Sequence, residues 1–277
     1  MSERKRVRGL HTRRDRVLGE TDLNEMFETL DRGYTNEHHP EDGFVYWQTH
    51  WDKKLQLERQ AKVKVHINVP MARGLLAMFW LFGKRVYETI RLRARDIWCQ
   101  DDGYLYARFT VQKKVPVNEQ KAGVATHGPI VTKRVTLENP YTEYVVEYMK
   151  TITANDKDPE ARVFPGGSMG KHVVQRHVKL KGRNPDGSTQ EYEKTYEYVK
   201  DEIGILPAAR AWQIVKALDE HAWTHLFRTS LATTMVEREH VTEEELVSWF
   251  DWSSIETAHR YVKGGTSTTE KLSKRTW

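Results

Sequence analysis

The stretch THLFRTSLATTM, residues 224–235, decides the fold class, because two kinds of side chain separate on it when it is drawn as a helix. His225 and Arg228 lie three positions apart and share one helical face, on which the small residue Ala232 also falls. A separate apolar stripe on this helix consists of Phe227, Leu231 and Met235. A His and an Arg over a small residue suit an anion, although H-x-x-R alone has low specificity in so basic a chain.

A second pattern, GKRVYETIRLRARDI at residues 83–97, places an arginine shortly after an apolar helix ends. Pro70 suits the first turn of that apolar helix and Gly83 its C-terminal stop. Arg85 follows the stop, and Glu88 lies one helical turn further on. Taken by itself, this pair favours a surface ion pair at i, i+3 spacing.

The third pattern, DWSSIETAHRYV at residues 251–262, raises the question of what Tyr261 does. Ile255, Ala258 and Val262 define the apolar stripe of the predicted helix, and Tyr261 falls about 90–100° from the centre of that stripe. A core tyrosine is expected on the stripe itself. The position is therefore compatible with a nucleophile that reaches sideways, and equally with a surface aromatic residue.

The composition restricts the class of protein. The chain has 277 residues, of which 38% are hydrophobic and 30% charged, as is usual for a folded globular protein. No apolar run approaches the roughly 20 residues that cross a bilayer, so we expect a protein of the cell interior with no membrane partner. Cys99 is the only cysteine, which excludes a disulfide framework and a cysteine zinc site. The first sixteen residues carry seven Arg or Lys and two acids, a net charge of +5 that equals the net charge of the whole chain.

The predicted elements are mostly helical. Helices are expected over residues 21–33, 44–60, 70–82, 84–97, 141–152, 209–221, 223–239, 242–250 and 253–264. Three of them have predicted N-caps: Thr21, Thr242 with Glu245, and Ser253 with Glu256. Alternating patterns over 104–114 and 128–137 predict two strands of a hairpin, and 178–200 reads as a charged excursion that turns at residues 184–188. We therefore expect an α+β fold, mainly α-helical, with a small antiparallel β-sheet.

The three patterns together resemble the tyrosine recombinase (phage integrase) family. In chain order they read G-x-R-x-x-E-x-x-x-L-x-x-x-D-I, H-x-x-R-x-x-x-A-T and W-S-S-I-x-T-x-x-x-Y, and Tyr261 lies nine residues after Trp252. The resemblance covers about residues 63–265, and HLFRTSLATT and SSIETAHRY are its most specific parts. It implies the catalytic-domain fold of that family.

The resemblance also implies a reaction. Tyr261 would attack a DNA phosphodiester, form a 3′-phosphotyrosyl link and release a 5′-hydroxyl, with no metal, ATP or other cofactor. Arg85 and Arg228 would grip the phosphate oxygens, since a guanidinium binds phosphate bidentately and keeps its charge. His225 would take the tyrosyl proton or hydrogen-bond the phosphate.

The family protonates the leaving 5′-oxygen with a lysine on a β-hairpin. Here Lys113 and Lys114 end the first predicted strand, and Lys133 lies on the return strand. We favour Lys113 and keep the other two as alternatives.

Two positions depart from the common family pattern. Trp252 stands where many members have histidine, and Asp251 where many have glycine. An indole N–H donates a hydrogen bond but does not give up or accept a proton in acid–base catalysis, so we expect Trp252 to position the phosphate. Glu88 is expected to orient Arg85 or brace its helix.

The resemblance divides the chain into a basic, disordered arm over residues 1–18, a short helical segment over 19–62, a catalytic domain over 63–265 and a tail over 266–277. The segment before residue 63 is shorter than the family's usual core-binding domain, which puts target affinity in question. The expected partner is double-stranded DNA, bound by a homo-tetramer, with an accessory DNA-bending protein as a further candidate. The expected location is the cytoplasm and nucleoid, or the host-cell interior for a viral protein.

Three functions remain open on this reasoning. The leading one is a site-specific recombinase or integrase. A type IB topoisomerase or telomere resolvase shares the chemistry, and relaxation of supercoiled plasmid without recombinants would favour it. The third is a DNA-binding regulator that keeps the fold without the reaction. Such a protein has no need for the two arginines, His225, the candidate lysine and Tyr261 together.

Overall fold

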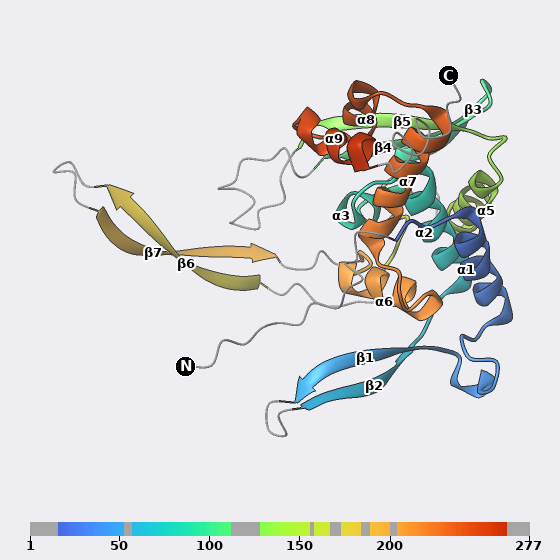
Figure 1. Cartoon of the computed structure of the whole chain (residues 1–277), viewed down its shortest axis with the longest axis horizontal. Coiled ribbons are helices and arrows are strands. Elements are labelled where there is room, and N and C mark those ends of the chain that lie inside the picture. Colours follow the sequence, from blue (N-terminus) through green and yellow to red (C-terminus); the bar gives the residue numbers. More distant parts are fainter. Residues whose placement is uncertain are drawn as a thin grey trace, which may run out of the picture. The chain divides into compact units, whose positions relative to one another are not determined.

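The computed structural model describes residues 16–52, 57–111, 128–155, 158–166, 173–183, 189–199 and 204–264 (Figure 1). The chain divides into two compact units, one made of residues 1–69, 79–83 and 214–277 and the other of residues 70–78 and 84–213. Helices α2 (Val69–Phe82) and α6 (Ala208–Leu218) contribute residues to both. Across the described ranges, no helix combines the length and the apolar character that a membrane crossing requires.

The first unit combines helices with one β-hairpin. Its elements are α1 (Glu20–Arg32), the 3₁₀ helix η1 (Pro40–Asp42), β1 (Phe44–Asp52), β2 (Leu57–Val65), α7 (Thr224–Glu239), α8 (Glu243–Phe250) and α9 (Ile255–Gly264). The sequence prediction of the last three helices is confirmed to within about two residues.

Helix α1 buries the predicted stripe of Leu23, Met26, Phe27 and Leu30. It ends at Gly33, whose φ of 84° lies in the left-handed region that glycine adopts without strain. Its start differs from the prediction, because the helix begins at Glu20 with Gly19 as the N-cap and Thr21 lies inside the first turn. The Asp22 carboxylate accepts the Gly19 N–H at 2.7 Å, which replaces the predicted threonine cap.

The segment before α1 is held against α7. Leu18 is fully buried, and its N–H donates to the Ser230 hydroxyl at 2.7 Å. The Arg16 guanidinium donates to both oxygens of Asp219, at 2.5 and 3.0 Å. Burial raises the pKa of the Asp219 carboxyl, but the Arg16 hydrogen bond and further favourable contacts outweigh it and leave this pKa below its ordinary value. Residues 16–18 are thus tied to the fold, where the sequence predicted a disordered arm; residues 1–15 lie outside the described part.

The predicted helix over residues 44–60 is wrong, because this segment forms most of the β1–β2 hairpin. The strands pair antiparallel, with Phe44 opposite Val65 and Asp52 opposite Leu57. Side chains alternate between the two sides of such a ribbon, and Phe44 and Tyr46 are buried while Trp47 is 55% exposed. The stabilising contacts are therefore cross-strand, and a helical period cannot describe them.

Helices α8 and α9 close this unit around a core formed with α7. The buried members of that core are Ala232, Leu246, Phe250, Trp252 and Ala258. The capping box of α8 is confirmed, since the Thr242 hydroxyl accepts the Glu245 N–H at 3.3 Å and the Glu245 carboxylate accepts the Thr242 N–H at 2.8 Å. The box predicted for α9 is wrong by one residue. The helix begins at Ile255, and Glu256 is hydrogen-bonded by Ser254, which lowers the pKa of this carboxyl.

The second unit contains a three-stranded antiparallel sheet in the order β3–β4–β5. Its strands are β3 (Ile97–Gln100), β4 (Tyr104–Thr110) and β5 (Ile130–Thr136). The two predicted strands are confirmed by β4 and β5, which lie within the predicted ranges. One face of β4 is buried through Leu105, Ala107 and Phe109, whereas its other residues are half-buried or exposed.

The predicted helix over residues 84–97 is wrong after its first turn. Helix α3 covers only Val86–Thr89, and the chain then forms the 3₁₀ helix η2 (Ala94–Asp96) and enters β3. Backbone hydrogen bonds explain the early end: the Ala94 N–H donates to the Ala161 carbonyl at 2.8 Å, and the Val163 N–H to the Leu92 carbonyl at 3.0 Å. A distant segment thus takes over the backbone groups that a longer helix would use.

Helix α5 (Tyr141–Asn155) packs against α2 where Gly74 allows close approach, since a Cβ on Gly74 would lie 2.6 Å from the Tyr148 ring. The buried Tyr148 hydroxyl donates to the Val163 carbonyl at 2.6 Å. The charged excursion forms a second hairpin, of β6 (Val173–Arg183) and β7 (Thr189–Val199). The predicted turn at residues 184–188 lies outside the described residues.

Candidate active site

Among the predicted site residues that the structure describes, Arg228 is the most buried charged side chain. It lies on α7 with 1% of its surface exposed. One terminal nitrogen donates to the Gly83 carbonyl at 2.8 Å and the other to the Phe250 carbonyl at 2.6 Å. Phe250 is the last residue of α8, so its carbonyl lies at the helix end that favours a cation. The guanidinium therefore fastens the ends of two helices, α2 and α8, to α7.

Gly83 is required by this arrangement for two separate reasons. Its φ is 57°, in the left-handed region that favours glycine. A Cβ at this position would also lie 2.7 Å from the Phe250 ring and 2.9 Å from Leu231. The glycine of the G-x-R pattern thus brings a backbone carbonyl within reach of Arg228.

Three aromatic rings form a column next to Arg228, which we call the aromatic stack: Phe250, Trp252 and Tyr261. The Phe250 and Trp252 rings are 4.9 Å apart and 21° from parallel, and the Trp252 and Tyr261 rings are 5.2 Å apart and 9° from parallel. The Arg228 guanidinium carbon lies 4.8 Å from the centre of the Phe250 ring and 5.6 Å from that of Trp252. Positive charge therefore lies against the faces of the rings that lead to the tyrosine.

Tyr261 is half-buried, and its ring covers one face of Trp252. The predicted apolar stripe of α9 is wrong at Ile255, which is 42% exposed, while Ala258 is fully buried as expected. The side chain of Val262 lies outside the described residues. The buried face of α9 thus runs through Ala258 toward Tyr261, whose ring stacks on the indole of Trp252. Tyr261 is a supported side chain and not a free surface aromatic residue.

Trp252 is only 8% exposed, at the turn between α8 and α9. Asp251 before it has a φ of 53°, which explains why glycine would be suitable there and why aspartate, which tolerates this region, is accepted. The packing of Trp252 between two rings adds a supporting contact that the sequence did not indicate.

His225 lies in the first turn of α7 and is exposed. A second histidine, His259, lies two residues before the tyrosine on α9, and its Nδ1 is 2.5 Å from a carboxylate oxygen of Glu243 on α8. This contact joins the tyrosine-bearing helix to the start of α8. No local sequence pattern points to His259, because its partner Glu243 lies on a different helix.

In the second unit, Arg85 pairs with Glu88. One terminal nitrogen of Arg85 lies 2.8 Å from one carboxylate oxygen, and the Arg85 N–H donates to the other at 3.0 Å. The side chain of Glu88 is 1% exposed and that of Arg85 is 22% exposed. The pair is therefore not the surface ion pair that the spacing alone favours. The carboxylate is buried, and it orients the arginine while capping α3, in agreement with the supporting role expected of Glu88.

Lys84, between Gly83 and Arg85, is a functional candidate that the sequence analysis missed. It is 1% exposed, and its ammonium lies 5.5 Å from the centre of the Phe109 ring on β4. No local pattern indicates burial of a lysine next to an arginine. Lys133 lies on β5 opposite Ala107 and is half-buried. The favoured general acid, Lys113, and its neighbour Lys114 lie outside the described residues. Over the ranges that the structure does describe, no three His, Cys, Asp or Glu side chains are grouped to hold a metal ion.

The helices and small antiparallel sheets have the fold of the tyrosine recombinase catalytic domain. The chain is similar to XerH site-specific recombinase bound to difH substrate in a pre-cleavage complex, with a TM-score of 0.50 and 12% identity over 93% of this chain and 53% of that one. It is also similar to XerH bound to a palindromic difH substrate in a post-cleavage complex, with a TM-score of 0.51, 12% identity and coverage of 93% and 52%.

The chain spans about half the length of the XerH chains that it matches. No family model matches the chain, and no curated protein matches its sequence. At 12% identity this similarity establishes the fold and not the chemistry.

Proposed function

We propose that this protein is a site-specific DNA recombinase that cleaves and rejoins DNA through a 3′-phosphotyrosyl intermediate, with Tyr261 as the nucleophile. The observation that carries the proposal is the aromatic stack, which supports Tyr261 one ring away from the buried cation of Arg228. The fold shared with XerH, whose structures are complexes with DNA substrates, supports the same class of partner.

The proposed step is a transesterification. The Tyr261 oxygen bonds to phosphorus as the bond from phosphorus to the 5′-oxygen breaks. His225 takes the phenolic proton, and Lys113 gives a proton to the 5′-oxygen, with Lys114 and Lys133 as alternatives. The number of phosphoester bonds is unchanged, so a 5′-hydroxyl can reverse the step without an external energy source.

The two arginines have different parts in this proposal. Arg85 is partly exposed and bound to one side by Glu88, so its guanidinium is oriented before a phosphate arrives. Arg228 supplies fixed positive charge from a buried position, where charge is weakly screened and acts strongly on a nearby anion. Trp252 supports the ring of the nucleophile and is proposed to donate its indole N–H to the phosphate.

On this proposal the protein acts on double-stranded DNA as a homo-tetramer, with an accessory DNA-bending protein as a further partner. The test is a library of random-sequence duplexes with a 5′ label and a nick, from which the released 5′-hydroxyl fragment diffuses away. The parent chain is expected to give a denaturation-resistant adduct that keeps the 5′ label, and mass spectrometry is expected to place the nucleotide on Tyr261. Sequencing of the trapped strands then gives the target site.

The control variants are Tyr261→Phe and Tyr144→Phe. Both remove one phenolic oxygen from a half-buried tyrosine, but Tyr144 lies on α5. The adduct is expected to disappear in Tyr261→Phe and persist in Tyr144→Phe. An adduct of unchanged yield in Tyr261→Phe would refute the assignment of the nucleophile, and relaxed plasmid without recombinant product would favour the topoisomerase.

A further inference from the structure

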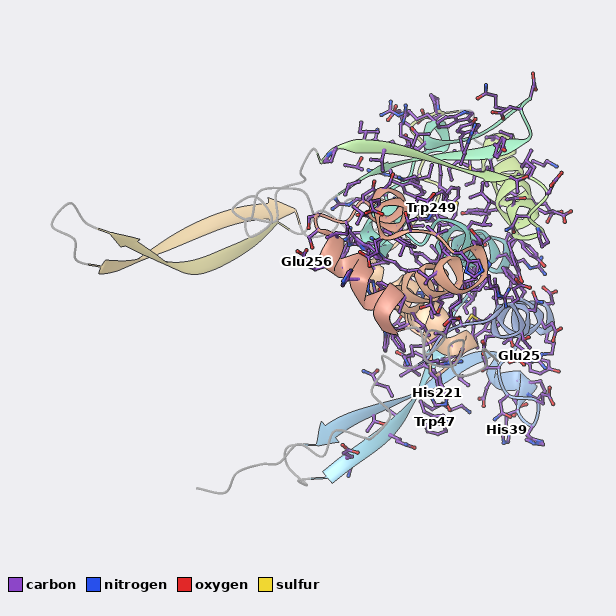
Figure 2. The ribbon with its side chains drawn as sticks, turned by 45° about the horizontal axis from the view of Figure 1, so that its top comes forward. Glu25, His39, Trp47, His221, Trp249 and Glu256 are labelled. Carbon is purple, nitrogen blue, oxygen red and sulfur yellow. The ribbon has the colours of Figure 1, made fainter. Side chains whose placement is uncertain are left out.

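The β1–β2 hairpin presents a large aromatic side chain to solvent. Trp47 on β1 is 55% exposed, and Figure 2 labels it on this ribbon. Burying an exposed indole is one of the largest single contributions that a side chain makes to a binding interface.

The hairpin holds Trp47 in place from its opposite face. Phe44, Tyr46 and Val65, at the base of the ribbon, are all less than 10% exposed. Thr35 fixes the start of β1, because its hydroxyl accepts the Val45 N–H at 2.9 Å. With that face anchored in the core, the alternation of side chains turns Trp47 away from it.

Apart from Val45, the residues beside Trp47 on this side of the ribbon are polar or cationic. Lys62 lies directly opposite Trp47 in the register, Lys64 lies opposite Val45, and the exposed Gln60 lies opposite the exposed Thr49. Lys62 forms an ion pair with Asp42, at the start of the hairpin. We call this surface the Trp47 face, made of Val45, Trp47, Thr49, Gln60, Lys62 and Lys64.

We propose that the Trp47 face binds double-stranded DNA, an inference that rests on the proposed function and assigns it a second contact surface. A two-stranded β-ribbon has the width that the major groove admits. Lys62 and Lys64 can neutralise phosphates, while Trp47 packs against the groove or the sugar edge. A second copy of the chain fits less well, because a symmetric contact centred on Trp47 would bring the lysines of both copies together.

Affinity for an uncleavable duplex tests this proposal, measured by fluorescence anisotropy between 50 and 200 mM salt in a Tyr261→Phe background. Trp47→Ala is expected to raise Kd about tenfold, as truncation of a buried interface aromatic commonly does, and Trp47→Tyr to restore most of the affinity. Replacing Lys62 and Lys64 by Ala is expected to reduce the slope of log Kd against log salt by about 1 to 2.

A gain of affinity separates this role from a structural one. Asp42→Asn removes the carboxylate that pairs with Lys62, so it is expected to lower Kd about threefold and steepen the salt dependence. Misfolding would not produce that result. The matched control is Lys150→Ala, which removes one charge from an exposed lysine on α5 and is expected to change neither quantity.

Unchanged Kd and salt slope in the Trp47, Lys62–Lys64 and Asp42 variants would overturn this proposal, even if the parent forms the Tyr261 adduct. Loss of a dimer in Trp47→Ala without DNA, at unchanged Kd, would also overturn it and identify the face as a contact between copies. A parent that binds duplex without forming the adduct would refute the proposed reaction and leave the binding face to be decided by these variants. A parent that does not bind duplex would refute both.

Discussion

The region around Arg228 and the region around Arg85 both hold an arginine in place, but with opposite kinds of partner. Arg228 is almost fully buried and bound to two backbone carbonyls at helix ends. Arg85 keeps 22% of its side chain exposed and is bound to a carboxylate. The carbonyls that bind Arg228 belong to the backbone and fix this arginine within the fold. The carboxylate that binds Arg85 leaves part of the guanidinium exposed, and a second anion can bind there.

The difference indicates a division of labour between the two sites. Replacing Arg228 should damage the fold and the reaction together. Replacing Arg85 conservatively should damage the reaction and spare the fold. On the proposed function, Arg228 would thus build the site and Arg85 would act in it. Three predictions test this division, and a fourth concerns an ion pair with a structural role only.

The largest effect is expected for Arg228→Ala. It removes two hydrogen bonds and leaves the Gly83 and Phe250 carbonyls buried without this donor, at roughly 1–3 kcal/mol each. We expect the free energy of unfolding in urea to fall by about 4 kcal/mol. The free energy of unfolding of Arg228→Lys is expected to fall by nearly as much, because one ammonium does not reproduce the planar geometry of the guanidinium donors. Stability equal to the parent would show that the hydrogen bonds from Arg228 to the Gly83 and Phe250 carbonyls, which we call the Arg228 bridge, do not stabilise the fold.

A smaller loss is expected for Gly83→Ala, which tests the bridge from its backbone side. The substitution combines a positive φ with contacts of 2.7 and 2.9 Å to Phe250 and Leu231, and we expect a loss of about 3 kcal/mol. Gly33→Ala is the matched control, since its φ is 84° but nothing lies within 4 Å of the added Cβ. It is expected to lose about 1 kcal/mol, and equal losses at both positions would exclude crowding as a cause.

The third effect is expected for Arg85→Lys, measured as the rate of adduct formation. The lysine keeps a charge near Glu88 but cannot bind phosphate bidentately. We therefore expect adduct formation to be at least tenfold slower, which corresponds to about 1.4 kcal/mol of activation free energy. The free energy of unfolding is expected to change by less than about 1 kcal/mol. Arg108→Lys is the control, because Arg108 pairs with Asp96 at 2.8 Å on the same unit and no reaction role is proposed for it. An unchanged rate in Arg85→Lys would contradict a direct contact with phosphate.

The smallest effect concerns the purely structural pair of Arg16 and Asp219. The pKa of Asp219 is lowered in the folded chain, so the pair stabilises the fold above the ordinary carboxyl pKa of 3.8. This contribution is lost as the pH falls through the lowered, folded-state pKa. We expect Asp219→Asn to cost about 1 kcal/mol at pH 7 in urea unfolding and the difference from the parent to shrink below pH 3.8. A difference that stays constant down to pH 2 would show that the charge of Asp219 is not involved.

The sequence predicted elements well wherever local pattern and packing agree. The stripe of α1, the capping box of α8 and the extents of α7 to α9 all depend on contacts within a few residues. The β1–β2 hairpin was missed because its stabilising contacts join residues up to 21 positions apart, and because its Lys, Gln and Glu residues are good helix formers. The truncation of α3 has the same kind of cause, since its backbone partners lie some seventy residues away.

The sequence proposed residues for the candidate site but gave no information on their surroundings. The resemblance to the tyrosine recombinase family suggested Arg85, Arg228 and Tyr261 as a set. It could not show that Arg228 would be bound to carbonyls, nor that the Trp252 ring would turn the buried face of α9 toward Tyr261. These are properties of chain segments that meet only in three dimensions.

The bridge made by Arg228 also has a consequence for the order of folding. Its bond to the Gly83 carbonyl joins residues 145 positions apart, and its bond to the Phe250 carbonyl joins residues 22 apart. The contact with Gly83 requires a loop of this length to be closed before it can form. A chain still emerging from the ribosome has neither the anchored cation nor the supported tyrosine until α8 and α9 have been made. If the proposed reaction is correct, the capacity to cleave DNA would therefore appear only after α8 and α9 have been made and packed.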